Sequence, residues 1–288
     1  MADRASSLPD GRILRCGRFV LRLDRPLIMG IVNITPDSFS DGGAFLDANR
    51  AIDQAHRLVE EGADIIDLGA ESTRPGAASV TIAEELDRLL PVVTGLANLD
   101  IPISVDTLKP AVMRAALKAG ASMINDVNAF RATEAIEAVA STGAAVCAMH
   151  MQGEPRTMQA DPAYADVVSE VDTFLRERIA TLSTAGIAND RIVIDPGFGF
   201  GKNLDHNLAL LRELSRFRRA GVAVMAGLSR KSMLGRMTGR PAGERLSASV
   251  AAALLAVQRG ADIVRVHDVA ATRDALAVLA AVEGGERC

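Results

Sequence analysis

Several side chains that could bind or polarise a ligand stand at the ends of short apolar segments of this chain. Asp106, Asn125 and Asp195 each close a run of β-branched or other apolar residues, which is the pattern of a buried parallel strand. Two carboxylates and an amide can together accept and donate hydrogen bonds at a flat nitrogen heterocycle. Lys231 could bind the carbonyl oxygen of such a ring, and Phe200 could form an apolar wall beside it. The alternative for these residues is buried structural hydrogen bonding.

A second group of residues indicates a site for an oxyanion or phosphate. Arg265 and His267 are two positions apart in an apolar run, so their side chains share one face of a strand. A guanidinium beside an imidazole favours a phosphate, and Lys231 is a further candidate there. The alternative is a structural ion pair between Arg265 and Asp268. Asn33 also ends an apolar run, and its neutral oxygen suits a hard cation that brings its own phosphate and waters.

Other patterns carry less weight. His150 follows an apolar run, but a buried core histidine explains it nearly as well. The segment 197–202 has alternating glycines and ends in a lysine, yet it lacks the four-residue spacer of a phosphate-binding P-loop, and Asn203 replaces the Ser or Thr of that motif. The segment 229–232 offers a Ser or Lys nucleophile without an evident base. No pair of histidines or cysteines has zinc spacing.

Apolar runs alternate with segments of helical periodicity, which predicts a parallel sheet covered by helices. The expected strands are 27–32, 64–68, 101–105, 122–124, 144–149, 191–194, 222–228 and 261–266. The expected helices are 51–61, 82–96, 110–117, 133–141, 167–182, 207–217, 246–257 and 272–282. Thr272 is expected to cap the last helix.

Eight such units predict a single α/β domain, a closed (β/α)8 barrel of the TIM type, for which 288 residues suffice. The carboxyl ends of barrel strands converge, which would bring the polar groups above into one site. The barrel domain is expected to span 13–288, with 1–12 as a flexible N-terminal tail and a short hairpin at 12–23 on the barrel floor. The loops 33–43 and 71–76, rich in Gly, Pro, Ser and Thr, are candidate lids.

Composition excludes several classes of partner. A net charge of −4 gives no basis for nucleic acid or a membrane surface. No apolar run approaches the ~20 residues of a membrane span, and the N-terminus has no hydrophobic signal core. The three cysteines lie far apart in the sequence, which favours reduced thiols in a cytoplasmic protein.

The residues at these strand ends resemble those of the dihydropteroate synthase family, the pterin-binding barrels of folate biosynthesis and the targets of sulfonamides. The motifs are GIVNITPDSFSDGG at 30–43, DLGAESTRPG at 67–76, SVDT at 104–107, INDV at 124–127, MHMQG at 149–153, DPGFGFGK at 195–202, GLSRKS at 227–232 and RVHDV at 265–269. The resemblance covers roughly residues 13–283, and its motifs occur in the family's order.

The resemblance implies a role for each matching residue. The dihydropterin ring would be bound by Asp106, Asn125, Asp195 and Lys231. The diphosphate would be held by Asn33, Thr73, Arg265 and His267, with Mg²⁺ on Asn33. The p-aminobenzoate pocket would consist of Phe39, Arg74, Pro75, Phe200, Lys231 and Ser232. The catalytic residues would be Asp106, Lys231, Arg265 and His267. Family members are usually homodimers, so a homodimer is expected.

The implied reaction joins (7,8-dihydropterin-6-yl)methyl diphosphate to 4-aminobenzoate and releases diphosphate. Stabilising the departing polyanion would drive C–O cleavage. Asp106 would stabilise the remaining methylene cation, which the arylamine then attacks. One alternative is a methyltetrahydrofolate-dependent methyltransferase, which would not need Arg265 and His267. The other is a pterin-binding paralogue without turnover, which would be expected to have lost residues from the two glycine-rich loops.

Overall fold

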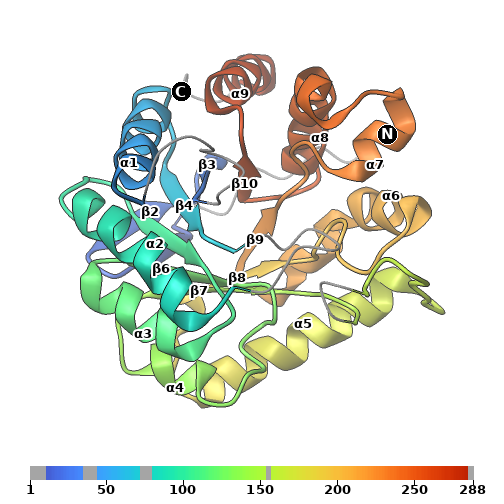
Figure 1. Cartoon of the computed structure of the whole chain (residues 1–288). Coiled ribbons are helices and arrows are strands. Elements are labelled where there is room, and N and C mark those ends of the chain that lie inside the picture. The colour runs from blue at the N-terminus through green and yellow to red at the C-terminus, as the bar shows by residue number, and fades with distance from the viewer. Residues whose placement is uncertain (1–10, 35–43, 72–79, 154–156, 285–288) are drawn as a thin grey trace.

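A closed barrel of parallel strands, ringed by helices, forms the centre of the molecule (Figure 1). The computed structural model describes residues 11–34, 44–71, 80–153 and 157–284, with the backbone alone at 44–46. The barrel strands are β3 (Leu27–Asn33), β4 (Ile65–Gly69), β5 (Ile103–Asp106), β6 (Met123–Asp126), β7 (Ala145–Met149), β8 (Ile192–Asp195), β9 (Ala223–Ala226) and β10 (Ile263–Val266). They follow one another in chain order around the barrel, and β10 closes it against β3. The predicted (β/α)8 barrel is therefore confirmed.

A helix or helices follow each barrel strand and cover the outside of the barrel (Figure 1). They are α1 (Ala44–Glu60), α2 (Ile82–Leu96), α3 (Pro110–Ala119), α4 (Ala135–Ala140), α5 (Val167–Thr184), α6 (Leu204–Arg212), α7 (Ser232–Thr238), α8 (Leu246–Gln258) and α9 (Val269–Glu283). Short 3₁₀ helices are η2 (Asn189–Arg191), η3 (Leu214–Ala220) and η4 (Ala242–Glu244). In the described residues, no helix is long and apolar enough to cross a membrane.

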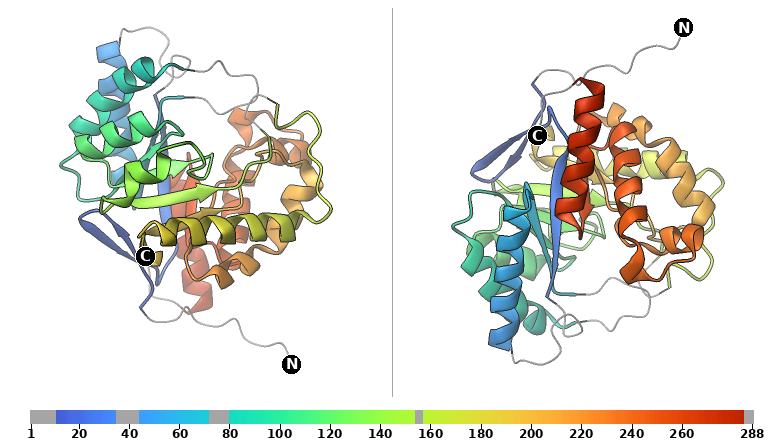
Figure 2. Two further views of the ribbon diagram at one scale, coloured as in Figure 1. Left: turned by 90° about the horizontal axis from the view of Figure 1, so that it is seen from below. Right: turned by 90° about the horizontal axis from the view of Figure 1, so that it is seen from above.

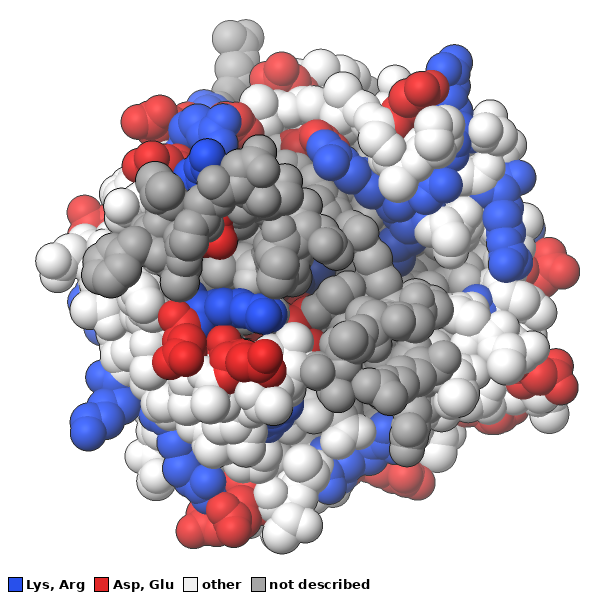
Figure 3. Space-filling view, viewed as in Figure 1, with Lys and Arg blue, Asp and Glu red and all other residues white. Residues whose placement is uncertain are grey.

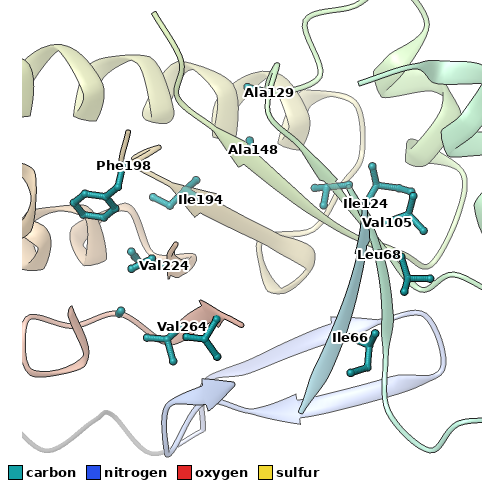
Figure 4. Close-up of a cluster of buried hydrophobic side chains, with 14 of the residues drawn as sticks. Ile66, Leu68, Val105, Ile124, Ala129, Ala148, Ile194, Phe198, Val224 and Val264 are labelled. Carbon is teal, nitrogen blue, oxygen red and sulfur yellow. The ribbon is translucent and has the colours of Figure 1, made fainter. Parts of the chain in front are cut away.

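Side chains alternate between the inside and the outside of the barrel, as the period of two along a strand requires. On β4, Ile66 and Leu68 belong to the apolar layer between strands and helices (Figure 4), whereas Ile65 belongs to the barrel interior. The interior cluster also contains Met123, Val193 and Ile263. Two residues after each of these four interior residues stand, in the same order, Asp67, Asn125, Asp195 and Arg265. The apolar interior thus supports a polar layer at the carboxyl ends of the strands.

The N-terminal hairpin closes the opposite end of the barrel (Figure 2). Its strands β1 (Ile13–Cys16) and β2 (Phe19–Arg22) pair antiparallel, which confirms the hairpin predicted at 12–23. Leu14 and Cys16 are fully buried in the interior cluster. Arg12 donates to both carboxylate oxygens of Asp262, at 2.8 and 3.0 Å, just before β10 begins. The expected tail at 1–12 lies, except for its last two residues, outside the described residues.

The observed helices depart from the predicted ones at a few places. The segment predicted as one helix at 207–217 is divided between the end of α6 and the start of η3. Helix α7 was not predicted, since seven residues are too few to show a helical period. The expected cap at Thr272 is wrong, because α9 begins at Val269 and the Thr272 hydroxyl donates to the carbonyl of Asp268 at 2.8 Å. A Thr inside a helix can form this bond, so its presence does not mark a helix start.

Candidate active site

The carboxyl ends of the strands bring acidic, amide and guanidinium groups into one layer inside the barrel. Strand register places Asp106 beside Asn125, and Arg265 projects into the same layer from β10. Arg265 Nε donates to Asp67 Oδ2 at 2.6 Å, and Arg265 Nη2 donates to Asp106 Oδ2 at 3.0 Å. Asn125 Nδ2 donates to the same Asp67 oxygen at 3.4 Å. Residues from four different strands therefore form one hydrogen-bonded cluster.

The ion pair considered for Arg265 with Asp268 is wrong. Asp268 instead accepts two hydrogen bonds from the guanidinium of Arg230, at 2.5 and 3.1 Å. Arg230 has a φ of +56°, which is uncommon for a residue with a side chain, and it directly precedes Lys231. This outer ion pair holds the turn after β9 and leaves Arg265 to the carboxylates inside the barrel.

Burial and neighbouring charge determine how these groups titrate. Burial raises the pKa of Asp106 to about 7; the charge of Arg265 opposes the rise and that of Asp67 adds to it. Burial also raises the pKa of Asp195, and Lys231 opposes it. Burial lowers the pKa of Lys231 to about 8, against the effect of Asp195. Burial acts to lower the pKa of Arg265, but the neighbouring carboxylates outweigh it and raise that pKa. The cluster thus holds a permanent cation beside a carboxyl group that titrates near neutral pH.

Lys231 connects this cluster to the loop after β8. Its Nζ donates to the carbonyl oxygen of Phe198 and lies 4.7 Å from the centre of the Phe200 ring, a cation–π contact. A Cβ added at Gly227 would lie 3.7 Å from Asp195 Oδ2 and 3.8 Å from Lys231 Nζ, so these two groups face the same small space. Asp195, Lys231 and Phe200, which were predicted to share a site, lie together.

The glycine-rich loop after β8 is held by protein contacts at its backbone. Gly197, Gly199 and Gly201 have φ values of +71°, +80° and +62°, which glycine adopts without steric cost. The amide of Gly199 donates to Asn207 Oδ1 at 2.7 Å, and the carbonyl of Gly201 accepts from the Tyr164 hydroxyl at 2.8 Å. Backbone amides, which a P-loop would direct at a phosphate, are occupied here, since those of Gly197 and Gly199 donate to Asp195 Oδ1 and Asn207 Oδ1, both at 2.7 Å. This agrees with the motif's failure in the sequence.

His267 lies at the end of β10, next to the seryl hydroxyl of the β9 turn. Its Nδ1 is 2.9 Å from Ser229 Oγ, and its backbone amide donates to the same oxygen at 3.2 Å. Ser229 was not predicted as a site residue, although its position two residues before Lys231 was a signal. Ser232 begins α7 directly after that lysine. The turn after β9 therefore contains both Lys231 and the serine that contacts the His267 imidazole.

Asn33 ends β3 at the same level of the barrel. It pairs with Gly69 in the strand register, and its Oδ1 would lie 3.9 Å from a Cβ added there. Among the described residues, no group of three or more His, Cys, Asp or Glu side chains could hold a metal ion. A neutral oxygen such as Asn33 Oδ1 fits Mg²⁺, which binds few protein oxygens when substrate phosphates and waters supply the others.

Four predicted site residues, Phe39, Thr73, Arg74 and Pro75, lie outside the described residues. Next to the 72–79 segment, Glu71 Oε2 accepts from Lys109 Nζ at 2.6 Å, and Glu71 Oε1 accepts from the amide of Val80 at 3.1 Å. Lys109 Nζ also donates to the buried carboxylate of Glu85 at 2.5 Å. Lys109 therefore joins Glu71 to α2, and Glu71 in turn binds the amide of Val80.

Asp67 is a residue that the predicted set of site residues did not include. It is fully buried, and its Oδ1 has no hydrogen-bond partner among the described residues. Its signal in the sequence was a carboxylate inside an apolar run, where charged groups rarely lie without a partner. His150, by contrast, is a buried histidine that fits the core alternative. Burial, with the charge of Lys202, lowers the pKa of His150 to about 3.

Charge of both signs is present on the face seen in Figure 1. Figure 3 shows acidic and basic side chains interspersed over the described part of this face. Mixed charge of this kind creates only a weak long-range field. Long-range attraction of a charged ligand to the described part of this face is therefore weak.

The sequence model of a family described as pterin binding enzyme matches residues 29–267. The chain belongs to this pterin-binding enzyme family. Dihydropteroate synthase of Escherichia coli (strain K12) is 49% identical over 262 residues, which cover 91% of this chain and 93% of that protein. Dihydropteroate synthase of Neisseria meningitidis serogroup B is 50% identical over 273 residues, covering 92% and 96% of the two chains. The match extends over nearly the whole of each protein.

Solved structures of the family agree with the fold. Xanthomonas albilineans dihydropteroate synthase with 4-aminobenzoic acid has a TM-score of 0.90 and 53% identity, with 96% of this chain and 99% of that chain covered. Burkholderia cenocepacia dihydropteroate synthase complexed with 7,8-dihydropteroate has a TM-score of 0.87 and 53% identity, with 94% and 96% covered. The predicted family and the predicted dihydropteroate synthase activity, a transfer reaction of folate synthesis, are confirmed by these comparisons.

Proposed function

We propose that this pterin-binding enzyme joins (7,8-dihydropterin-6-yl)methyl diphosphate to 4-aminobenzoate, forming 7,8-dihydropteroate and diphosphate. The observation that carries the proposal is the Arg265 guanidinium, held between the carboxylates of Asp67 and Asp106 at the converging strand ends. The relatives support the choice of substrates, since one is solved with 4-aminobenzoic acid and another with 7,8-dihydropteroate.

The dihydropterin ring would lie in the barrel, between the acidic cluster and Lys231. Asp195 and Asn125 offer hydrogen-bonding groups to the ring nitrogens, and Lys231 offers its ammonium to the ring carbonyl. Gly227 leaves open the space that Asp195 and Lys231 share. A ring in this position would bring its methylene carbon toward the strand ends, where Asp106 lies.

The diphosphate would be bound by Arg265, His267, Asn33 and, as implied by the family resemblance, Thr73. In the described residues, Arg265 binds its two carboxylates through Nε and Nη2, which leaves Nη1 for a phosphate oxygen. Asn33 would hold Mg²⁺ through its side-chain oxygen. The ion, when bound, would neutralise part of the charge on the diphosphate.

The reaction follows from placing the Arg265 guanidinium and the His267 imidazole beside the diphosphate and the Asp106 carboxyl beside the methylene carbon. Arg265 and His267 would stabilise the negative charge that develops on the departing diphosphate. Asp106, once ionised, would stabilise the pterin methylene cation that remains. Because its pKa is about 7, its ionised form dominates only above neutral pH. This route requires no protein nucleophile.

The second substrate would bind beside Lys231. Phe200 would form an apolar wall for the 4-aminobenzoate ring, and Ser232 with Lys231 would reach its carboxylate. Phe39, Arg74 and Pro75 stay proposed members of this pocket on the strength of the family resemblance. The same resemblance supports a homodimer, and the composition supports a cytoplasmic location; both stay proposals.

Product formation tests the proposed reaction directly. Purified protein with Mg²⁺, the dihydropterin diphosphate and 4-aminobenzoate should form 7,8-dihydropteroate, detected by chromatography. A sample without 4-aminobenzoate is the control. Folded protein that forms no dihydropteroate would refute the proposal. Transfer of a methyl group from methyltetrahydrofolate would support the methyltransferase alternative instead.

Substitution of the guanidinium tests the assigned diphosphate site. Arg265→Ala should weaken binding of the pterin diphosphate far more than binding of a diphosphate-free pterin, measured by calorimetry. Some loss for both ligands is expected, because Asp67 and Asp106 lose their shared partner. Asp67→Asn keeps the Arg265 guanidinium, so its effect on binding measures the loss that comes from disturbing the cluster alone. Equal losses for the two ligands in Arg265→Ala would argue against the assignment.

A further inference from the structure

Lys202 is a lysine whose ammonium lies inside the protein. The residue is 2% exposed. Its Nζ lies 2.9 Å from each of three acceptors, namely the carbonyl oxygens of Gly197 and Phe200 and the Nδ1 of His150. Two of these acceptors belong to the loop that Lys202 itself ends, and the third belongs to the residue after β7. Lys202 therefore stabilises the fold of its own loop and connects this loop to the end of β7.

The contacts fit a charged lysine and a neutral histidine. An ammonium has three N–H donors for these acceptors and for the His150 carbonyl, which lies 3.3 Å from Nζ, whereas a neutral amine has only two. Burial lowers the pKa of Lys202, and the charge of Asp195 opposes that shift. The pKa of His150, lowered to about 3 by burial and by Lys202, keeps its ring neutral and able to accept at Nδ1. The Lys202 ammonium lies among backbone carbonyl groups, whose dipoles can replace the hydration that it loses on burial.

The loop fastened by Lys202 forms the wall beside Lys231. The carbonyl of Phe198 accepts from Lys231 Nζ, and the Phe200 ring lies 4.7 Å from it. A Cβ added at Gly199 would lie 3.2 Å from Lys231 Cδ. The two carbonyls that Lys202 binds thus flank the residues that touch Lys231. Any movement of these carbonyls would displace both the Phe198 oxygen and the aromatic ring.

We propose that Lys202 is a positioning residue, which acts on the proposed reaction by holding the 197–201 loop in the conformation that places the Lys231 ammonium. The inference rests on the proposed function, since Lys231 matters as a ligand for the two substrates. Among the described residues, the hydrogen bonds of the Lys202 ammonium go to Gly197, Phe200 and His150 and not to Lys231; its charge acts on Asp195 and Lys231 only through space.

Hydrogen bonds elsewhere on the loop provide a matched control. The Tyr164 hydroxyl donates to the carbonyl of Gly201 at 2.8 Å, on the same loop but beyond the residues that contact Lys231. Tyr164→Phe removes one hydrogen bond from this loop and leaves both carbonyls bound by Lys202 in place. A general loosening of the fold would affect Tyr164→Phe and Lys202→Met alike, whereas positioning of Lys231 would affect only the latter.

The experiment is a double-mutant cycle on the whole enzyme. We expect Lys202→Met to lower kcat/KM for the dihydropterin diphosphate by roughly 30-fold or more, and Lys231→Ala to lower it further. If Lys202 acts through Lys231, the double variant should equal Lys231→Ala to within about threefold, because coupled residues are not additive. Tyr164→Phe should stay within about threefold of the wild type. Losses that multiply in the double variant would overturn the proposal.

A second measurement is independent of the size of the loss. The alkaline limb of the kcat/KM profile, expected near pH 8 from Lys231, should move upward in Lys202→Met, because the loosened wall admits water and because the positive charge of Lys202 no longer acts on Lys231. An unmoved limb would overturn the proposal. If Lys202→Met does not fold, His150→Leu replaces it in the cycle and should show a smaller loss with the same non-additivity. A wild type without product refutes the proposed function, whereas an active wild type with additive variants refutes only this inference.

Discussion

Replacing Asp67 by Asn removes one negative charge from the buried cluster and leaves its shape nearly unchanged. Asp67 is fully buried and Arg265 is 20% exposed on its side chain. Breaking a buried ion pair costs about 3–5 kcal/mol. Two effects reduce this cost, because Arg265 keeps Asp106 at 3.0 Å and the new amide oxygen can still accept from Arg265. We expect Asp67→Asn to lower the free energy of unfolding by about 2 kcal/mol, a fall in Tm of roughly 5 °C.

The same substitution should change the titration of Asp106. The charge of Asp67 helps to raise the pKa of Asp106 to about 7. Removing a like charge at close range lowers a carboxyl pKa, typically by one unit or more. Since the ionised Asp106 is the proposed active form, the acid limb of kcat/KM should move from about pH 7 toward about pH 6 in Asp67→Asn. The position of the limb is the readout, not the height of the profile.

The pH dependence of stability should change in the same direction. An unfolded Asp titrates near pH 3.9, whereas folded Asp106 titrates at about 7. Between these values the folded state binds more protons at Asp106, so its contribution to stability falls as pH rises from about 4 to about 7. A lower pKa of Asp106 in folded Asp67→Asn lowers the upper limit of the pH range over which stability falls. Thermal unfolding between pH 4 and pH 8 measures this change.

A neighbouring ion pair supplies the control. Asp268→Asn breaks the pair with Arg230, whose side chain is 39% exposed. An exposed pair contributes about 0–1 kcal/mol, so the fall in Tm should be clearly smaller than in Asp67→Asn. The acid limb should stay in place, because Asp268 is not among the charges that shift Asp106. An unmoved acid limb in Asp67→Asn, or equal shifts in both variants, would refute the electrostatic reasoning.

Two further substitutions test how the loops are held. Gly197→Ala should lower the free energy of unfolding by roughly 4 kcal/mol, because φ is +71° and a Cβ would overlap the backbone of the residue after β7; Gly186→Ala, at φ +89° with open space around it, should cost only about 1–2 kcal/mol, and a thermal melt that shows equal losses would refute the close approach. Lys109→Met should cost about 3–5 kcal/mol, because it leaves the fully buried Glu85 carboxylate without its cation; chemical denaturation measures it, and a loss below 1 kcal/mol would show that the carboxylate is solvated or protonated.

The sequence pattern alone predicted the barrel fold, and it predicted that the candidate site lies at the carboxyl ends of the strands. Strands buried on both faces read as continuous apolar runs, and helices between them show a period near 3.6. Asp106, Asn125 and Asp195 end such runs, so the convergence of barrel strands predicted their meeting.

Partners distant in sequence were decided by the tertiary structure alone. The sequence left open whether Arg265 would pair with the adjacent Asp268, and the barrel instead offers it Asp67, 198 positions away. The spacing of residues along the sequence cannot predict the Arg265–Asp67 pair, because the strand register around the barrel determines which side chains share a layer. Burial likewise lowers the pKa of Lys202 and raises the pKa of Asp106 to about 7, since desolvation depends on every element packed around a group and not only on its neighbours in the chain.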